Sequence, residues 1–131
     1  HKYAGRKSLS LDEICKEPLA LPDHSFGIRQ SFERTVAKHK LNPRVLVTTN
    51  SLELTNTMAV TGQFIAFKPA LAVITQLGSG QLRAIPVADA ELAAARSSIS
   101  VHRDRPLSHA AQEFLKLLTT TIRTSKAKNR K

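Results

Sequence analysis

The chain has 131 residues, of which 41% are hydrophobic, and this size and composition suit a single soluble domain with a core of its own. Its formal net charge of +10 favours an anionic partner. The single cysteine, Cys15, excludes an internal disulfide and a CxxC metal motif, which favours a reducing compartment such as the cytoplasm. No apolar run reaches the roughly 20 residues that span a bilayer, so the sequence predicts no membrane partner.

Capping signals, prolines, glycines and hydrophobic periodicity divide the chain into short strands and helices. The sequence predicts strands at 19–21, 44–49, 63–68, 82–87 and 97–103. It predicts helices at 11–17, 28–40, 51–61, 70–77 and 109–122, and it leaves residues 88–97 undecided. Strands that alternate with helices form right-handed βαβ units, so the expected class is α/β with a mostly parallel sheet flanked by helices.

Three of the predicted helices begin with a capping signal. Ser10 is followed by Glu13 at the spacing of a capping box. Asn50 is expected to be the N-cap of another helix, with Glu53 at the same spacing. Ser108 is expected to cap the last helix of the chain.

The last predicted helix carries a wide apolar stripe. Its members are Ala111, Phe114, Leu115, Leu118 and Ile122. Burial of one large apolar side chain is worth about 1.5 to 3 kcal/mol, so the stripe is expected to pack on a partner surface.

Both ends of the chain are basic. The segments HKYAGRK at 1–7 and RTSKAKNRK at 123–131 contain Lys and Arg but no acidic residue. One interpretation is a nucleic-acid arm, because clustered Lys and Arg bind phosphates by releasing counterions. No aromatic residue interleaves the charges of the last segment, and this favours two solvated ends instead.

The sequence offers no catalytic or metal-binding pattern. The HRD triplet at 102–104 lacks the downstream Asn of a kinase catalytic loop. The GSGQ turn at 78–81 has neither a preceding strand nor the Lys of a phosphate loop. The 5 histidines show no ligand spacing. We therefore expect no enzyme activity, no metal and no cofactor.

The ends of two predicted strands offer a candidate binding edge. In a parallel α/β sheet, ligands bind beyond the carboxyl ends of the strands, where helix N-termini present free N–H groups. Thr49, Asn50 and Ser51 occupy one such junction, and the loop at 24–28 occupies another. The two junctions are expected to face one cleft, although Asn50 and Ser51 could also be plain caps that need no ligand.

Four segments of the chain carry a resemblance that spans most of its length. They are HKYAGRKSLSLDEICKEPLAL, LNPRVLVTTNSLELTNTMAVTGQFIAFKP, LGSGQLRAIPV and RPLSHAAQEFLKLL. In this order they resemble the effector-binding region of LysR-type transcriptional regulators, from His1 to about Arg123. The resemblance implies a type 2 periplasmic-binding-protein fold, in which two Rossmann-like lobes hold a small inducer between them.

The resemblance also implies how the chain is divided. Residues 1–105 would form the second lobe, and 106–124 would form a helix that returns to the first lobe. Residues 125–131 would be a disordered basic tail. Because the chain opens with His1, most of the first lobe and the DNA-binding domain are expected upstream of it.

The implied effector-binding residues are Phe26, Gly27, Ile28, Thr49, Asn50, Ser51 and Phe67. Asn50 or Ser51 would donate hydrogen bonds to an effector carboxylate at the start of a helix. Phe67 would line the cleft from a strand end, with packing in the core as the alternative. Phe64 departs from the family, which often has a glycine there. Arg29 is expected on a solvated helix face, with contact to an anion as the alternative.

The expected function is that of a ligand sensor in a bacterial, cytoplasmic transcription regulator. The chain would bind a small organic anion, with a carboxylate as the expected group. The regulator would form a homo-oligomer and would contact DNA only through a winged helix-turn-helix upstream of this chain. The alternative is the solute-binding domain of a transport system, which shares the architecture.

Overall fold

The computed structural model describes residues 1–93 and 98–128. The chain divides into two compact units, His1–Arg96 and Ser97–Lys131, which are described separately. The first unit contains the sheet. The sheet has the strand order β2-β1-β3, and both of its pairings are parallel. The predicted α/β class with a parallel sheet is therefore confirmed.

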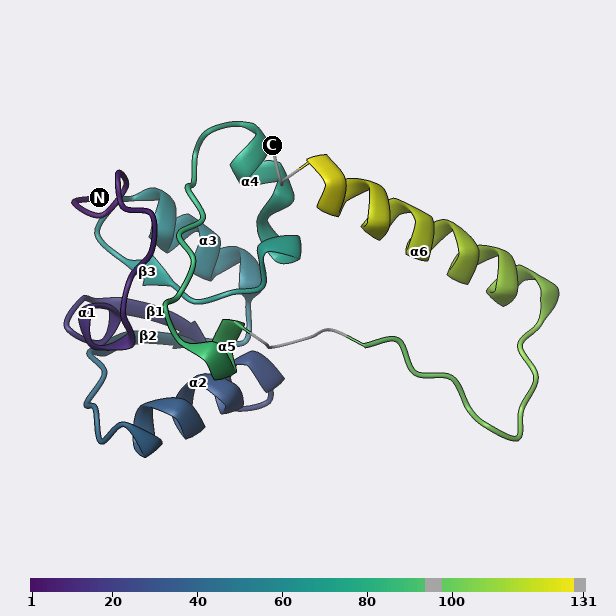
Figure 1. Cartoon of the computed structure of the whole chain (residues 1–131), viewed down its shortest axis with the longest axis horizontal. Helices are drawn as coiled ribbons and strands as arrows, with labels where there is room; N and C mark the ends of the chain where they lie inside the picture. Colours follow the sequence, from purple (N-terminus) through teal and green to yellow (C-terminus); the bar gives the residue numbers. More distant parts are fainter. Residues whose placement is uncertain (94–97, 129–131) are drawn as a thin grey trace. The chain divides into compact units, whose positions relative to one another are not determined.

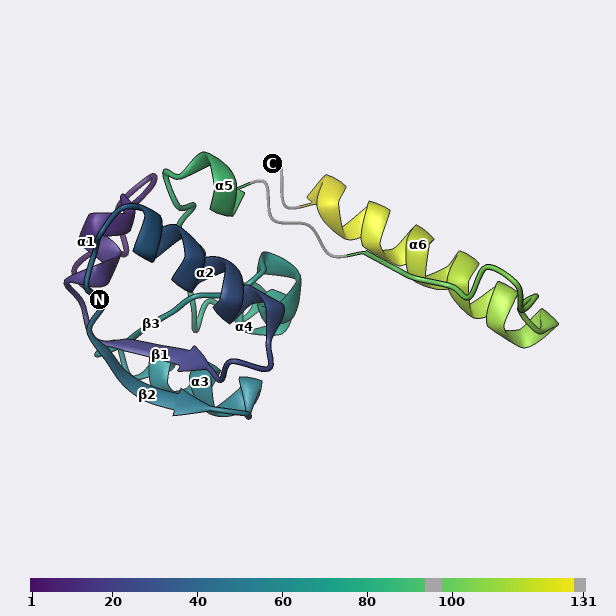
Figure 2. The same cartoon turned by 90° about the horizontal axis from the view of Figure 1, so that it is seen from below.

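Helices cover both sides of this sheet. Strands β1 (Leu19–Pro22) and β2 (Val45–Thr49) lie between α2 (Gly27–Lys38) and α3 (Leu52–Val60) (Figure 1). Seen from below, β1 and β2 run side by side in the same direction (Figure 2). The third strand, β3 (Ile65–Ala66), pairs with β1 on its other edge.

Several predicted elements are confirmed near their expected bounds. Helix α1 (Leu11–Cys15) has the complete capping box: the Glu13 N–H donates to Ser10 Oγ at 3.2 Å, and the Ser10 N–H donates to Glu13 Oε2 at 2.9 Å. Strands β1 and β2 and helix α2 also form as predicted. Helix α3 ends just before Gly62, whose φ of 73° is a left-handed conformation.

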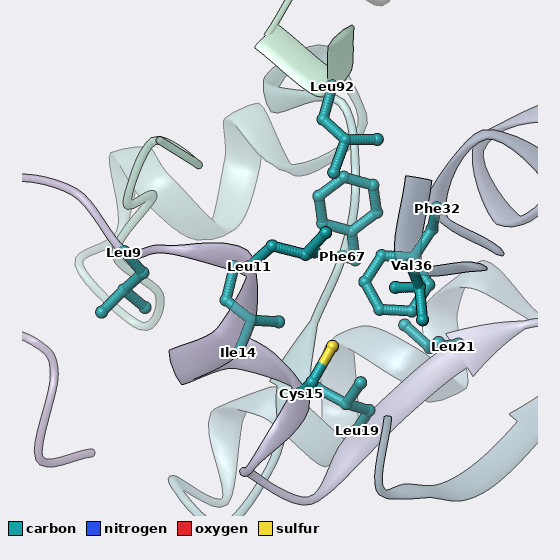
Figure 3. Packing of buried hydrophobic residues seen from close by; sticks show 10 residues of the cluster. All are labelled: Leu9, Leu11, Ile14, Cys15, Leu19, Leu21, Phe32, Val36, Phe67 and Leu92. Atoms are coloured by element: carbon teal, nitrogen blue, oxygen red, sulfur yellow. The ribbon is translucent and has the colours of Figure 1, made fainter. Parts of the chain in front are cut away.

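The core of this unit lies where α1, α2 and the sheet meet (Figure 3). Its ten buried residues are Leu9, Leu11, Ile14, Cys15, Leu19, Leu21, Phe32, Val36, Phe67 and Leu92. The rings of Phe32 and Phe67 pack with their centroids 5.2 Å apart and tilted by 44°. Leu92 comes from α5 (Ala90–Ala93), a short helix within the segment that the sequence left undecided.

Three of the predicted strands are wrong or much shorter. The strand predicted at 63–68 is reduced to β3. In place of a strand at 82–87 the structure has one bridge, between Leu9 and Val87. Pro86 limits the pairing because it has no N–H to donate. Its carbonyl accepts from the Leu9 N–H at 3.0 Å, and the Ala88 N–H donates to the Leu9 carbonyl; these two bonds make the bridge. Residues 98–103 form no strand, and residue 97 lies outside the described residues.

The helix predicted at 70–77 begins as a 3-10 turn. This turn, η1 (Ala70–Val73), leads into α4 (Ile74–Gly78). The Gly78–Gly80 turn follows directly, and Gly80 has a φ of 74°. The segment therefore keeps its helical character and its predicted end.

The second unit contains α6 (His109–Lys128). Ser108 caps it as predicted, since its Oγ accepts from the Ala111 N–H at 3.3 Å. The helix continues through 125–128, which the sequence assigned to a disordered tail, because this part contains good helix formers and no Gly or Pro. Residues 129–131 of that tail lie outside the described residues.

Two large apolar side chains of α6 are mostly exposed. Phe114 is 66% exposed and Leu117, which the sequence analysis did not include in the apolar stripe, is 67% exposed. The other members of the stripe, Ala111, Leu115, Leu118 and Ile122, are partly buried. Among the described residues, no helix has both the length and the apolarity needed to cross a membrane.

Replacing Gly62 by alanine should destabilise the first unit by about 1 to 2 kcal/mol, the cost of a left-handed conformation for a residue with a Cβ. The added Cβ would meet its nearest atom, the His1 nitrogen, at an ordinary 3.7 Å, so backbone strain is the only expected cost. Gly78→Ala is the matched control, because its Cβ meets nothing within 4 Å and its φ is not positive. Urea unfolding should separate the two variants, and equal stabilities would contradict this account.

Candidate functional site

The two predicted junctions lie side by side at the carboxyl edge of the sheet. Pro22, the last residue of β1, pairs in register with Thr49, the last residue of β2. The next residue, Asp23, donates its N–H to the Thr49 carbonyl at 2.9 Å. The loops that lead to α2 and α3 therefore start from neighbouring positions.

The start of α3 is capped by Ser51 and not by Asn50. Ser51 Oγ accepts from the Leu54 N–H at 3.2 Å, and the Ser51 N–H donates to Thr49 Oγ1 at 3.0 Å. The prediction of Asn50 as N-cap is wrong because Ser51 has the extended N-cap conformation and supplies the capping oxygen, so the helix begins at Leu52, one residue later than predicted. Asn50 is exposed, and its side chain has no hydrogen-bond partner among the described residues. It is therefore free to contact a ligand, whereas Ser51 has a structural role already.

The start of α2 presents apolar groups beside this junction. Phe26 is the N-cap residue and makes no side-chain capping bond. Phe26 and Ile28 are partly buried, and Gly27 is exposed. Asp23 orders the loop by accepting from Ser25 Oγ at 2.6 Å and from the Ser25 N–H at 2.9 Å, and these two bonds lower the pKa of Asp23.

Arg29 lies buried at the same edge and not on a solvated face, so the prediction for it is wrong. Its Nη1 donates to the Pro22 carbonyl at 3.3 Å, and its Nε donates to Glu33 Oε1 at 2.8 Å. The other oxygen of Glu33 lies 3.0 Å from His24 Nδ1. The guanidinium thus ties α2 to the end of β1. Sequence offered one signal for it, an acid four residues along the same helix.

Phe67 follows β3 at this edge, but its ring is buried in the core against Phe32. The structure brings Phe26, Gly27, Ile28, Thr49, Asn50 and Ser51 to neighbouring junctions, whereas it places the Phe67 side chain among the core residues. Phe64, the departure from the family pattern, is partly buried. A contact between Phe67 and an effector stays a prediction.

Lys68 is a cation at this edge that the sequence analysis missed. Its Nζ donates to the Leu52 carbonyl and to Asn56 Oδ1, both at 2.5 Å. Asn56 Nδ2 in turn donates to Glu53 Oε2 at 3.3 Å. Burial lowers the pKa of Lys68, and the charge of Glu53 offsets part of this effect. Nothing in the local pattern marks the contact, because Lys68 and α3 are brought together only by the fold.

A shallow hollow of about 220 Å³ lies beside α3. Its lining residues are Glu53, Asn56, Thr57, Val60, Gln76 and Gln81. Its walls are mostly polar, and they come from α3, α4 and the turn that follows α4. Within 1–93 and 98–128, no group of three or more His, Cys, Asp or Glu side chains could hold a metal ion.

Comparison with known proteins identifies the family of the chain. No curated protein matches the sequence. The family model described as the LysR substrate binding domain matches residues 1–123. This match spans the sheet, both junctions and most of α6, which is well over half of the chain. The chain therefore belongs to the LysR substrate binding domain family, which has a type 2 periplasmic-binding-protein-like fold.

Proposed function

We propose that the chain is the effector-sensing part of a LysR-type transcriptional regulator and that it binds a small organic anion. The observation that carries this proposal is the register of β1 and β2, which brings two strand-to-helix junctions to one edge. The first turn of α3 has N–H groups without intrahelical partners, and the aligned peptide dipoles favour an anion there. A carboxylate is the expected anionic group.

The expected contacts follow from the two junctions. Asn50 would donate its side-chain N–H groups to the carboxylate, and Ser51 would hold the helix start in place. Phe26 and Ile28 would supply apolar contacts for the rest of the effector, with Gly27 leaving room between them. Thr49 would act indirectly, because its hydroxyl oxygen accepts from the Ser51 N–H.

We propose that the lobe division expected from the sequence applies to this chain. The compact unit His1–Arg96 falls within the proposed second lobe, residues 1–105. The bridge between Leu9 and Val87 pairs the segment that would enter the lobe with the segment that would leave it, and this pairing supports the proposed division. Helix α6 covers most of the proposed return helix at 106–124, and its exposed Phe114 and Leu117 would pack on the first lobe.

In the full regulator, the effector would act on DNA through an upstream winged helix-turn-helix, in a homo-oligomer in the cytoplasm. By linkage, it can do so only if it binds one arrangement of lobes or protomers more tightly than another. A catalytic role is not part of the proposal. The family match favours a regulator over the solute-binding domain of a transport system.

Replacing Asn50 by alanine in the full-length regulator should weaken binding of its carboxylate effector by roughly tenfold or more, the loss expected for a hydrogen bond to a charged group. Its thermal stability should hardly change, because Asn50 is exposed and has no partner in the described part of the chain. Calorimetric titration and thermal melting measure the two effects.

Ser51→Ala is the matched control. It removes the cap of α3 and should cost about 1 kcal/mol of stability. Asn50→Ala should therefore change mainly the affinity for the effector, and Ser51→Ala should change mainly the stability. Unchanged carboxylate affinity in the Asn50→Ala, Ser51→Ala double variant would contradict the proposed site.

A further inference from the structure

The ammonium group of Lys68 lies against the first turns of α3, close to the junction after β2. It bonds to the carbonyl of Leu52, the first residue of that helix, and to the side chain of Asn56 one turn later. Leu52 directly follows Ser51, the N-cap. Lys68 is thus the cation that the fold brings to the helix start where the effector is proposed to bind.

The two acceptors that hold Lys68 are both neutral. No ion pair of Lys68 occurs within the described residues, although Glu53 is close enough to act on it electrostatically. Asn56 is 4% exposed, and its side-chain amide lies between the two charges, since it accepts from Lys68 and donates to Glu53. A lysine has three N–H donors, and two are used here. The partly buried cation therefore keeps a donor for an anion that the described residues do not supply.

The helix start makes this charge more effective. The N-terminus of α3 carries the positive end of its dipole, and a cation beside it adds to that positive potential. Removing water around a charge strengthens its interaction with an opposite charge, so partial burial increases the attraction for an anion. A neutral donor at this position would satisfy Leu52 and Asn56 but would add nothing to the potential.

We propose that Lys68 is a specificity-determining residue that selects an acidic effector over its uncharged analogue by supplying the counter-charge at the start of α3. This inference rests on the proposed function, whose site it deepens. Glu53 has the opposite effect in the same site, because its negative charge lowers the potential that the anion meets. Lys68 and Glu53 together therefore set how strongly the site prefers an acid over its uncharged analogue.

The test uses the full-length protein that contains this chain and a panel of acids paired with their amides: acetate with acetamide, benzoate with benzamide, and succinate with succinamide. Affinities come from calorimetric titration, and melting temperatures without ligand report folding. In the wild type, at least one acid should bind more tightly than its amide. Lys68→Gln should lower the affinity for that acid by about tenfold or more and leave the amide unchanged.

Two further variants separate charge from structure. Lys68→Arg keeps the positive charge and should retain most of the preference for the acid. Glu53→Gln should raise the affinity for the acid by about two- to threefold, even though loss of an acid from the first turn slightly destabilises a helix. A purely structural role for this network would instead make every variant weaker in both stability and binding.

Equal preference for the acid in Lys68→Gln and wild type would overturn the role of Lys68. The proposed function would then still stand if Asn50→Ala weakened binding of the same acid. Binding of the amides alone would also overturn the role of Lys68, and so would a fall in acid affinity in Glu53→Gln. If no acid or amide on the panel binds the wild type, this inference fails together with the proposed anion site.

Discussion

Replacing Phe32 by alanine should lower the unfolding free energy of the first unit by about 3 to 5 kcal/mol, the usual cost of deleting a buried phenylalanine ring. Phe32 is 0% exposed and is the largest fully buried side chain of the chain's described part. Its ring packs on Phe67 with centroids 5.2 Å apart, so truncation also removes an aromatic contact. Since domains are stable by about 5 to 15 kcal/mol, much of the stability should disappear.

Leu46→Ala in β2 is the control for this prediction. Leu46 is 56% exposed, so its truncation should change the stability by about 0.5 kcal/mol or less. Urea unfolding followed by circular dichroism measures both variants. Similar midpoints for Phe32→Ala and wild type would show that the ring does not hold α2 on the sheet.

The elements in the first third of the chain could be predicted because each depends on residues that lie only a few positions apart in the sequence. The Ser10–Glu13 pair is a reciprocal capping box, and both of its bonds form. The four-residue spacing of Phe32 and Val36 defines the buried face of α2, and both side chains are in the core. In these places the local pattern and the tertiary packing require the same structure.

Asn50 shows where a local signal fails. It has the same capping spacing as Ser10, but the next residue, Ser51, is the N-cap of α3. Ser51 Oγ accepts from the Leu54 N–H, and the Ser51 N–H donates to Thr49 Oγ1. Both residue types favour the N-cap position, so the choice between them depends on the backbone conformation, which the residue types do not specify.

The strand predicted at 82–87 failed for a related reason. The mostly apolar segment LRAIPV is typical of a strand, but a strand also needs a partner with matching N–H and C=O groups. Pro86 interrupts the donors on one side, and the pairing with Leu9 stops after a single bridge. Periodicity alone could not show this.

The two cations at the candidate site were missed because long basic side chains reach groups that are remote in sequence. Arg29 was assigned to solvent from its place between apolar positions, yet its guanidinium reaches back to Pro22. Lys68 was not singled out, and its ammonium group reaches a helix that begins 16 residues earlier. The positions of the two junctions could be predicted from the ends of the strands. The charged groups around them could be located only once the folded structure was known.

Replacing Arg29 by methionine should cost about 1 to 3 kcal/mol at neutral pH, the value expected for hydrogen bonds made by a charged group. The variant keeps an apolar stem of similar length but loses the bonds to the Pro22 carbonyl and to Glu33. Arg34→Met on the exposed side of the same helix is the control and should change the stability by about 0.5 kcal/mol or less. Urea unfolding at neutral pH compares the two.

The pH dependence of this loss gives a second test with a fixed sign. Burial of Glu33 acts to raise its pKa, but the hydrogen bond and the charge of Arg29, together with His24, outweigh it, and the pKa of Glu33 is lowered. A lowered pKa stabilises the fold above the pKa of the unfolded carboxyl, which is about 4.3, and that contribution is lost as the pH falls through the folded value. The stability gap between wild type and Arg29→Met should therefore be widest near neutral pH and should narrow as the pH falls below the pKa of the unfolded carboxyl. A gap that stays constant or widens in acid would show that Arg29 stabilises the edge through packing and its bond to the Pro22 carbonyl and not through the charge of Glu33.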